Sequence, residues 1–127
     1  MEQEDIKLLL KDLCARLPYG VCVHIRYKEG EPCYGKLTSR DIQWFIDSNI
    51  EVIKPYLRPM SSMTEEELKE YHKTFFYHER YDNEHKTGQN CSITFETYDW
   101  LNKHHFDYRG LIKKGLAIAV TEENNPY

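Results

Sequence analysis

The stretch Ile53–Glu67, which reads I-K-P-Y-L-R-P-M-S-S-M-T-E-E-E, divides the chain into two parts of different character. Proline lacks a backbone N–H and is confined to sheet edges, so the piece between the two prolines, Tyr56 to Arg58, should be extended and lie at an edge. Residues 1–60 are expected to form a helix and a small β unit. Residues 61–121 are expected to be mostly helical.

The downstream part begins with a helix whose start is signalled twice. Thr64 and Glu67 have the spacing of a capping box. Met63 and Leu68 occupy the two positions of a hydrophobic staple. The helix is expected to bury a stripe formed by Leu68, Tyr71 and Phe75. The polar, non-periodic run that follows, residues 78–92, is predicted to be a flexible loop or a loose hairpin.

A second helix, a turn and a short strand are predicted for the C-terminal third. The helix spans about residues 93–105, with Tyr98, Leu101 and His105 on its buried face and Asp99, Asn102 and Lys103 outside. Asp107 is expected to cap the turn that follows, which Gly115 closes. Residues 116–120 should form a short strand and residues 122–127 a frayed tail.

The upstream part begins with an amphipathic helix over residues 3–17. Its apolar stripe lies at helical spacing and consists of Ile6, Leu9, Leu10, Leu13 and Leu17. Pro18 cannot continue the helical hydrogen bonds, so it ends the helix. The leucine stripe should pack on the β unit that follows.

A hairpin is expected next, with strands at residues 21–28 and 33–38. Apolar and polar residues alternate along the first strand, which indicates one buried face. A five-residue loop sets Val23 opposite Leu37, whereas a two-residue loop would set it opposite a lysine. The apolar pattern therefore favours the longer loop.

Residues 39–52 fit two secondary structures. The alternation typical of a strand connects Ile42, Trp44 and Ile46, but helical spacing connects Ile42, Phe45 and Ile46. The enrichment in aromatic and β-branched residues favours a third strand at residues 42–47, and one helical turn is expected at residues 50–53.

At 127 residues, the chain has the length of a single domain. The predicted fold class is α+β. An N-terminal helix packs on a small, bent antiparallel sheet, for which an SH3-like arrangement is one option, and two helices follow.

Composition excludes several kinds of partner. Seventeen basic and twenty-one acidic side chains leave a net charge of −4, with no basic patch for duplex nucleic acid. No apolar run approaches the ~20 residues that a membrane span needs, and no secretion signal is recognised, so a cytoplasmic location is expected.

The four cysteines lack C-x-x-C spacing, and Cys22 and Cys33 should point to opposite sheet faces. Free thiols are therefore expected.

Three motifs suggest chemistry without having the context for it. Gly30–Lys36 matches the first seven positions of a P-loop, but Leu37 replaces the required Ser or Thr and the segment is predicted to be a hairpin. The run His78–Asp82 resembles a zinc helix in which the second His is Asp, and it lies where helical periodicity fails. His104 and His105 are adjacent on a helix, so they point about 100° apart. No catalytic residue, metal ligand or cofactor is therefore expected.

Two Tyr/Arg sets remain as candidate ligand-binding residues: Tyr56 with Arg58, and Tyr108 with Arg109. Both lie in non-repetitive joints beside helices, where side chains can be displayed. Arginine beside aromatic rings suits the recognition of phosphates or carboxylates, or a protein hot spot. The alternative interpretation is structural, with both arginines capping carbonyls or pairing with acidic neighbours.

Three literal strings resemble a group of proteins: D-I-K-L-L-L-K-D-L-C-A-R-L-P-Y-G-V (5–21), K-P-Y-L-R-P-M-S-S-M-T-E-E-E (54–67) and H-H-F-D-Y-R-G-L-I-K-K-G-L-A (104–117). The chain is similar to small uncharacterised proteins of Bacteroides-type gut bacteria and their phages and prophages. The resemblance implies a bacterial, mobile-element origin and a location in the cytoplasm of the host cell. It implies no activity or ligand.

These observations favour a non-enzymatic accessory protein of phage or prophage type that binds a host protein, such as a defence or regulatory component. The ten tyrosines support a binding role, because the ring gives contact area and the hydroxyl a polar group. The alternative is a small-ligand binder that sequesters a nucleotide-like signal between Tyr/Arg pairs of neighbouring subunits in a homo-oligomer. A metal-dependent hydrolase that uses the histidines is a weaker alternative.

Overall fold

The computed structural model describes residues 2–78 and 90–127 and confirms an α+β architecture. Its helices are α1 (Gln3–Arg16), η1 (Leu17–Tyr19), α2 (Ser39–Ile46), η2 (Met60–Ser62), α3 (Glu65–Lys73) and α4 (Phe95–Lys103). Its strands are β1 (Cys22–Tyr27), β2 (Cys33–Lys36), β3 (Ile50–Leu57), β4 (Phe76–His78), β5 (Asn90–Ser92) and β6 (Ile118–Ala119). The N-terminal helix and the two later helices, α3 and α4, were all predicted.

The main sheet has the strand order β2-β1-β3-β6. Its first two pairings are antiparallel, but β6 runs parallel to β3 at Tyr56 and Leu57. The sheet is therefore mixed and open, so the expectation of a purely antiparallel sheet, with an SH3-like arrangement as one option, is wrong. The parallel pairing arises because the chain passes through α3 and α4 before it returns to the far side of β3.

The β1–β2 hairpin has a register two residues away from the predicted one. Val23 lies opposite Gly35, and Ile25 lies opposite Cys33. Leu37 lies beyond the paired residues and is buried in the core, with its N–H donated to the Val21 carbonyl at 2.8 Å. A shift of two residues leaves every side chain on its predicted face.

Residues 39–46 form helix α2, so the predicted strand at 42–47 is wrong. The helix begins with a reciprocal capping box. The Thr38 N–H donates to the Asp41 carboxylate at 3.0 Å, and the Asp41 N–H donates to the Thr38 hydroxyl at 3.3 Å. These two bonds satisfy the N–H groups of Thr38 and Asp41, which lie at the start of the helix and so have no carbonyl of an earlier helical turn to bind. The predicted helical turn at residues 50–53 is also wrong, because these residues begin β3.

Strand β3 lies inside the sheet, although its proline suggested an edge. Pro55 lies opposite Val23 of β1, and β6 pairs with the other side of β3. The Leu57 carbonyl accepts the Val120 N–H at 2.8 Å on the β6 side. Because backbone groups alternate along a strand, Pro55 faces the same side as Leu57, and it lies one residue before the first pair with β6. Its missing N–H therefore costs no bond to β1.

One face of the sheet carries the core. Leu9 and Leu13 of α1 are fully buried, and Ile42 of α2 joins them against Val23 and Ile53. The predicted packing of the leucine stripe on the hairpin is therefore confirmed. On the opposite face of the sheet Cys22 is buried, and the other side chains of β1 and β3 are half-buried or exposed. The antiparallel register keeps Cys22 and Cys33 on opposite faces, and both are free thiols.

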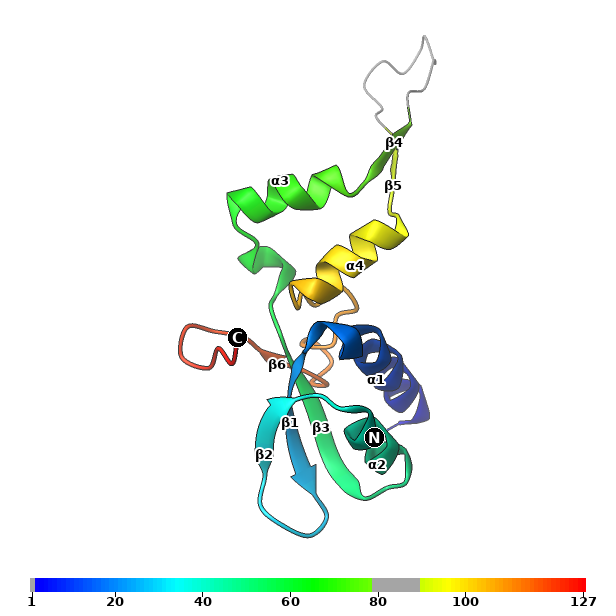
Figure 1. Cartoon of the computed structure of the whole chain (residues 1–127), viewed down its shortest axis with the longest axis vertical. Helices are drawn as coiled ribbons and strands as arrows, with labels where there is room; N and C mark the ends of the chain where they lie inside the picture. The colour runs from blue at the N-terminus through cyan, green and yellow to red at the C-terminus, as the bar shows by residue number, and fades with distance from the viewer. Residues whose placement is uncertain (1, 79–89) are drawn as a thin grey trace.

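Helices α3 and α4 lie at one end of the long axis with the β4–β5 pair, and β1, β2 and α2 lie toward the other (Figure 1). The Tyr71 and Trp100 rings stack between α3 and α4 at 5.6 Å. The predicted buried stripe of α3 is wrong at Leu68, which is 43% exposed, because α3 packs mainly on α4. On α4, Tyr98 is exposed and Asn102 is buried, the reverse of the prediction.

Two predicted irregular segments have different outcomes. The run at 78–92 has its flanks paired as β4 and β5, and residues 79–89 lie outside the described residues. The tail at 122–127 is docked, not frayed, because the Tyr127 ring stacks on His105 and its hydroxyl bonds to the backbone of β3. Asp107 caps the turn before Gly115 as predicted, accepting the N–H groups of residues 111 and 112 at 2.9 and 3.0 Å.

Candidate functional site

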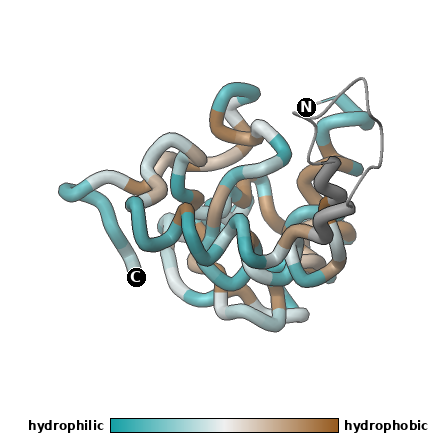
Figure 2. The backbone as a smooth tube through the Cα atoms, turned by 90° about the horizontal axis from the view of Figure 1, so that it is seen from above, coloured by the Kyte–Doolittle hydropathy of each residue, from teal (hydrophilic) through white to brown (hydrophobic). Residues whose placement is uncertain are grey.

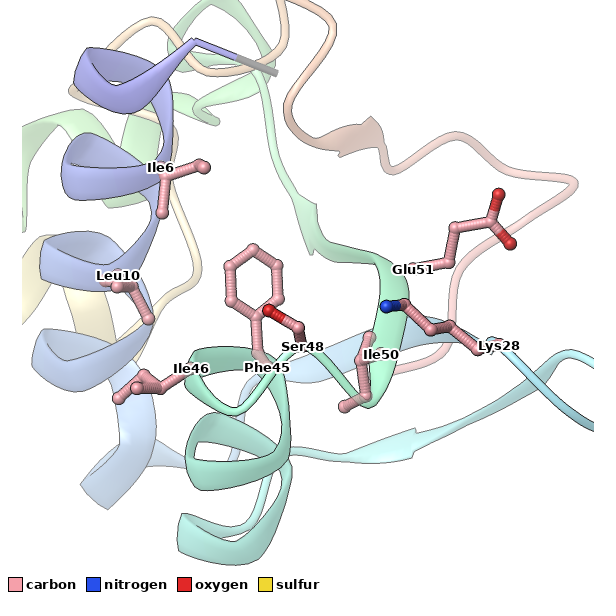
Figure 3. A pocket seen from close by; sticks show the side chains of 8 residues that line it. All are labelled: Ile6, Leu10, Lys28, Phe45, Ile46, Ser48, Ile50 and Glu51. Atoms are coloured by element: carbon pink, nitrogen blue, oxygen red, sulfur yellow. The ribbon is translucent and has the colours of Figure 1, made fainter.

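An open, mostly apolar groove lies between α1, the end of α2 and the start of β3 (Figure 3). Its volume is about 450 Å³, which is within the range of small-molecule and peptide-anchor sites. The lining residues are Ile6, Leu10, Lys28, Phe45, Ile46, Ser48, Ile50 and Glu51.

The groove exists because each helix has more apolar residues than the core accepts. In α1, Leu9 and Leu13 are fully buried, so Ile6 and Leu10 lie on a neighbouring stripe and remain half-buried. In α2, Ile46 is the last residue before the turn into β3 and is 55% exposed. Burial of such a side chain by a partner is worth roughly 1.5–3 kcal/mol.

The rim of the groove carries one cation and one anion. Figure 3 shows the Lys28 ammonium turned toward the groove and the Glu51 carboxylate turned away from it. Glu51 lies 3.7 Å from the Arg26 guanidinium, and both side chains are more than half exposed. Within residues 2–78 and 90–127, Lys28 has no ion-pair partner. The groove therefore presents an unneutralised positive charge beside an apolar floor.

Arg58 is held by a carboxylate and an aromatic ring. Its two terminal nitrogens donate to the two carboxylate oxygens of Glu67, both at 2.7 Å. The guanidinium also lies over the Phe106 ring, 4.2 Å from its centre. These Arg58 bonds hold the pKa of the Glu67 carboxyl well below its usual value, at about 2. Arg58 thus joins the end of β3 to the start of α3 and to the segment after α4.

Arg109 and Tyr108 belong to a separate cluster around Asp12. The Arg109 guanidinium donates to the Asp12 carboxylate and to the Tyr108 hydroxyl, each at 3.1 Å. The Tyr108 hydroxyl donates to the side-chain carbonyl of Asn102 at 2.9 Å, which accounts for the burial of Asn102. Asp12 also accepts the Arg16 Nε–H at 2.9 Å, and both of these side chains are fully buried.

Tyr56 lines a cavity that includes neither arginine. The cavity has a volume of about 280 Å³ and is also lined by Tyr34 of β2 and tail residues 123–126, and Arg58, Tyr108 and Arg109 are not among the lining residues. The ligand-binding role of these four residues stays a prediction. A phosphate at either arginine would have to displace a bonded carboxylate first.

The histidine motifs do not form a metal site within the described residues, where no group of three suitable ligands occurs. His104 packs on the Trp100 ring at 4.4 Å, and His105 stacks on Tyr127. All but the first residue of the 78–82 run lies outside the described residues. The P-loop-like segment 30–36 forms the turn and return strand of the hairpin, as predicted.

Sequence reasoning missed the groove because it assigned Phe45 and Ile46 to a strand. The signal that could have found it was the T-x-x-D spacing of Thr38 and Asp41, which marks a helix start. The docking of Tyr127 had no such signal, since its contacts lie 71 and 105 residues away.

No helix among the described residues is long and apolar enough to cross a membrane. Comparisons with protein-family models, with curated proteins and with solved structures find no match to this chain, so its function has to be argued from its own surfaces.

Proposed function

We propose that this chain is a non-enzymatic binding protein that captures a segment of another protein in the groove between α1, α2 and β3. The observation that carries the proposal is the exposure of Ile46 beside the half-buried Ile6, Leu10 and Phe45. Exposed apolar side chains that gather in a concave site are typical of protein interaction surfaces.

The charge at the rim narrows the chemistry of the partner. Lys28 is turned toward the groove, so a carboxylate next to an apolar anchor would complement both parts of the site. The proposed partner segment therefore carries a large aliphatic or aromatic residue next to Asp or Glu. The resemblance to phage and prophage proteins makes a cytoplasmic host protein the first partner to test.

The test compares three full-length, affinity-tagged chains in quantitative pulldowns from a bacterial host lysate. Ile46→Asp places a charge in the groove and should reduce capture of the specific partner at least about tenfold, the loss expected for one buried anchor. Ile93→Asp is the matched control, because Ile93 is equally exposed at 55% but lies outside the groove. It should capture the partner as well as the natural chain does.

A third variant tests the charge. Lys28→Glu reverses the sign at the rim and should weaken capture most at low ionic strength. Equal recovery of every protein by the natural chain and Ile46→Asp would contradict the proposed groove. Loss of capture with both Ile46→Asp and Ile93→Asp would mean that recovery reflects general surface stickiness.

A further inference from the structure

The Tyr127 hydroxyl occupies a gap in the main sheet. It accepts the Cys22 N–H of β1 at 3.0 Å and donates to the Tyr56 carbonyl of β3 at 2.7 Å. A single phenol oxygen thus connects two neighbouring strands through their backbones.

The register shows why a donor and an acceptor remain there. His24 lies opposite Lys54 in the β1–β3 pairing, so continuing the register places Cys22 opposite Tyr56. The last pair in this register is Val23 with Pro55, and one step beyond it the Cys22 N–H and the Tyr56 carbonyl both bind the Tyr127 hydroxyl. A buried N–H and C=O cost free energy when they lack partners, so the hydroxyl satisfies both in place of the missing bond.

The Tyr127 side chain occupies a slot formed by the His105 ring and by the backbones of Cys22 and Tyr56. His105 forms one side of this slot. Its ring stacks on the Tyr127 ring with 3.8 Å between centres and 8° between planes. His105 has a left-handed backbone, with φ of 63°, and its N-terminal neighbour caps the end of α4. Its carbonyl accepts the Arg58 N–H at 2.7 Å, which fixes this side of the slot against the end of β3.

The segment that carries Tyr127 makes few other bonds to the body. The Asn124 side chain accepts from the N–H and hydroxyl of Thr121 at 2.6 and 2.7 Å, and the Asn125 side chain accepts the Tyr127 N–H at 2.9 Å. These are bonds within the tail itself, which is hydrophilic along most of its length (Figure 2). Tyr127 remains 43% exposed, so the slot is open on one side.

We propose that this slot is a binding site for a tyrosine side chain on a polar segment, and that residues 121–127 occupy it as a displaceable ligand of the chain itself. The His105 ring favours a flat ring that can stack on it. The Cys22 N–H and the Tyr56 carbonyl favour a hydroxyl, because a hydroxyl can accept one hydrogen bond and donate another. Phenylalanine meets only the first requirement and histidine lacks the reach of the phenol. The slot therefore takes tyrosine from the tail or from another segment of the same kind.

The experiment uses full-length Tyr127→Ala, which vacates the slot, and two synthetic peptides, T-E-E-N-N-P-Y and T-E-E-N-N-P-F. The Cys22 amide resonance reports on the gap in NMR spectra. We expect it to move in Tyr127→Ala and to return toward its natural position with millimolar tyrosine peptide, because a tethered ligand acts at a millimolar effective concentration. The phenylalanine peptide should not restore it. Phe95→Ala, which removes an 89% exposed ring outside the slot, should leave the resonance unchanged.

A second measurement does not depend on the folding of the alanine variant. Tyr127→Phe keeps the stacked ring and removes the hydroxyl, so hydrogen exchange at the Cys22 amide should accelerate about tenfold, the effect of one lost bond. Unchanged exchange in Tyr127→Phe would overturn the role of the hydroxyl. Equal restoration by both peptides would overturn tyrosine selectivity, and no response to either peptide would show that the tail is not displaceable.

Discussion

At the scale of single residues, His105 combines constraints that rarely occur together. Its backbone is left-handed, its ring stacks on Tyr127, and its Nδ1 is buried without a hydrogen-bond partner among the described residues. Burial lowers the pKa of the His105 ring to about 4, and the positive charges of Arg16 and Arg58, with the neighbouring His104, act in the same direction. The ring is therefore neutral in the folded chain at ordinary pH.

The lowered pKa of His105 predicts a loss of stability in mild acid. The unfolded chain binds a proton near pH 6.5 and the folded chain only near pH 4, so the free energy of unfolding should fall as the pH drops through this window. A loss of about 1–3 kcal/mol is expected, allowing for partial exposure of the ring. Urea unfolding at several pH values measures it. His105→Asn tolerates the left-handed backbone and does not titrate, so it should flatten the curve; an equally steep curve would contradict the assignment.

Arg58 and Glu67 predict an effect at lower pH. The depressed pKa of Glu67 gives stability that is present above pH 4.5 and is lost as the pH falls toward 2. Arg58→Lys keeps the charge but loses the paired bonds and the flat contact with Phe106, so it should cost about 1–2 kcal/mol and raise the pKa of Glu67. NMR titration of the carboxyl measures that pKa. Arg26→Lys, in an exposed pair, should change stability by less than about 0.5 kcal/mol.

At the scale of elements, three helices begin in the same way. A threonine hydroxyl accepts the N–H of the residue three positions later in α2, α3 and α4, from Thr38, Thr64 and Thr94. In each case that later side chain accepts the threonine N–H in return. None of these helices exceeds nine residues, so their ends account for a large part of their backbone hydrogen bonding.

The cap of α2 gives a prediction that concerns both fold and groove. Thr38→Ala removes one acceptor and should lower the free energy of unfolding by about 1 kcal/mol, whereas Thr38→Ser should be close to neutral. Because Phe45 and Ile46 are held by α2, the alanine variant should also loosen the groove. Chemical denaturation measures the first effect, and hydrogen exchange of the α2 amides measures the second. A Thr38→Ala chain as stable as Thr38→Ser would show that the cap contributes little.

Local patterns predicted most elements where the signal lay within one or two turns. The Thr64–Glu67 box, the leucine stripe of α1 and the alternation in β1 were all confirmed. Segment 39–46 was misassigned because side-chain type was weighed above the equally local Thr38–Asp41 spacing. The strand that contains Pro55 was wrongly predicted to lie at a sheet edge. A proline is tolerated inside a sheet where its missing N–H faces a position with no strand partner, and which positions β6 pairs with could not be identified from the sequence.

At the scale of the whole molecule, backbone and side-chain bonds from distant segments join the two ends. Arg16 of α1 donates from Nη2 to the Phe106 carbonyl at 2.6 Å. Arg58 exchanges backbone bonds with the segment after α4, donating to His105 at 2.7 Å and accepting from Asp107 at 2.9 Å. The sheet with its helices and the α3–α4 pair therefore share one buried junction.

This junction predicts that both ends unfold together. Trp44 lies in α2 and Trp100 in α4, so the variants Trp100→Phe and Trp44→Phe each leave one fluorescent reporter. Their urea midpoints should shift in parallel when Asp12→Ala is added, because that change leaves the buried Arg16 charge without its carboxylate and should cost about 3–5 kcal/mol. A shift reported by only one tryptophan would mean that the ends unfold independently.

The candidate site was less predictable than the fold. The groove joins side chains from α1, α2 and β3, and no single segment carries its pattern. The Tyr/Arg sets were predicted to bind a ligand, which stays a prediction, and the carboxylates that bind the two arginines could not be identified from the sequence. Asp12, for example, binds an arginine 97 residues later in the chain. Which charges meet is decided by packing over the whole molecule.

The bridge at Tyr127 has a consequence for synthesis on the ribosome. Cys22 and Tyr56 leave the exit tunnel long before the residue that completes the hydrogen bonding between their strands, which follows them by 105 and 71 positions. A nascent chain can form α1, β1, β2, α2 and the pairing of β3 with β1 early, but the C-terminal end of β3, at Tyr56 and Leu57, must wait for β6 and Tyr127. Chaperones that bind emerging chains would meet this protein with one end of β3 unpaired, and release should coincide with arrival of the tail.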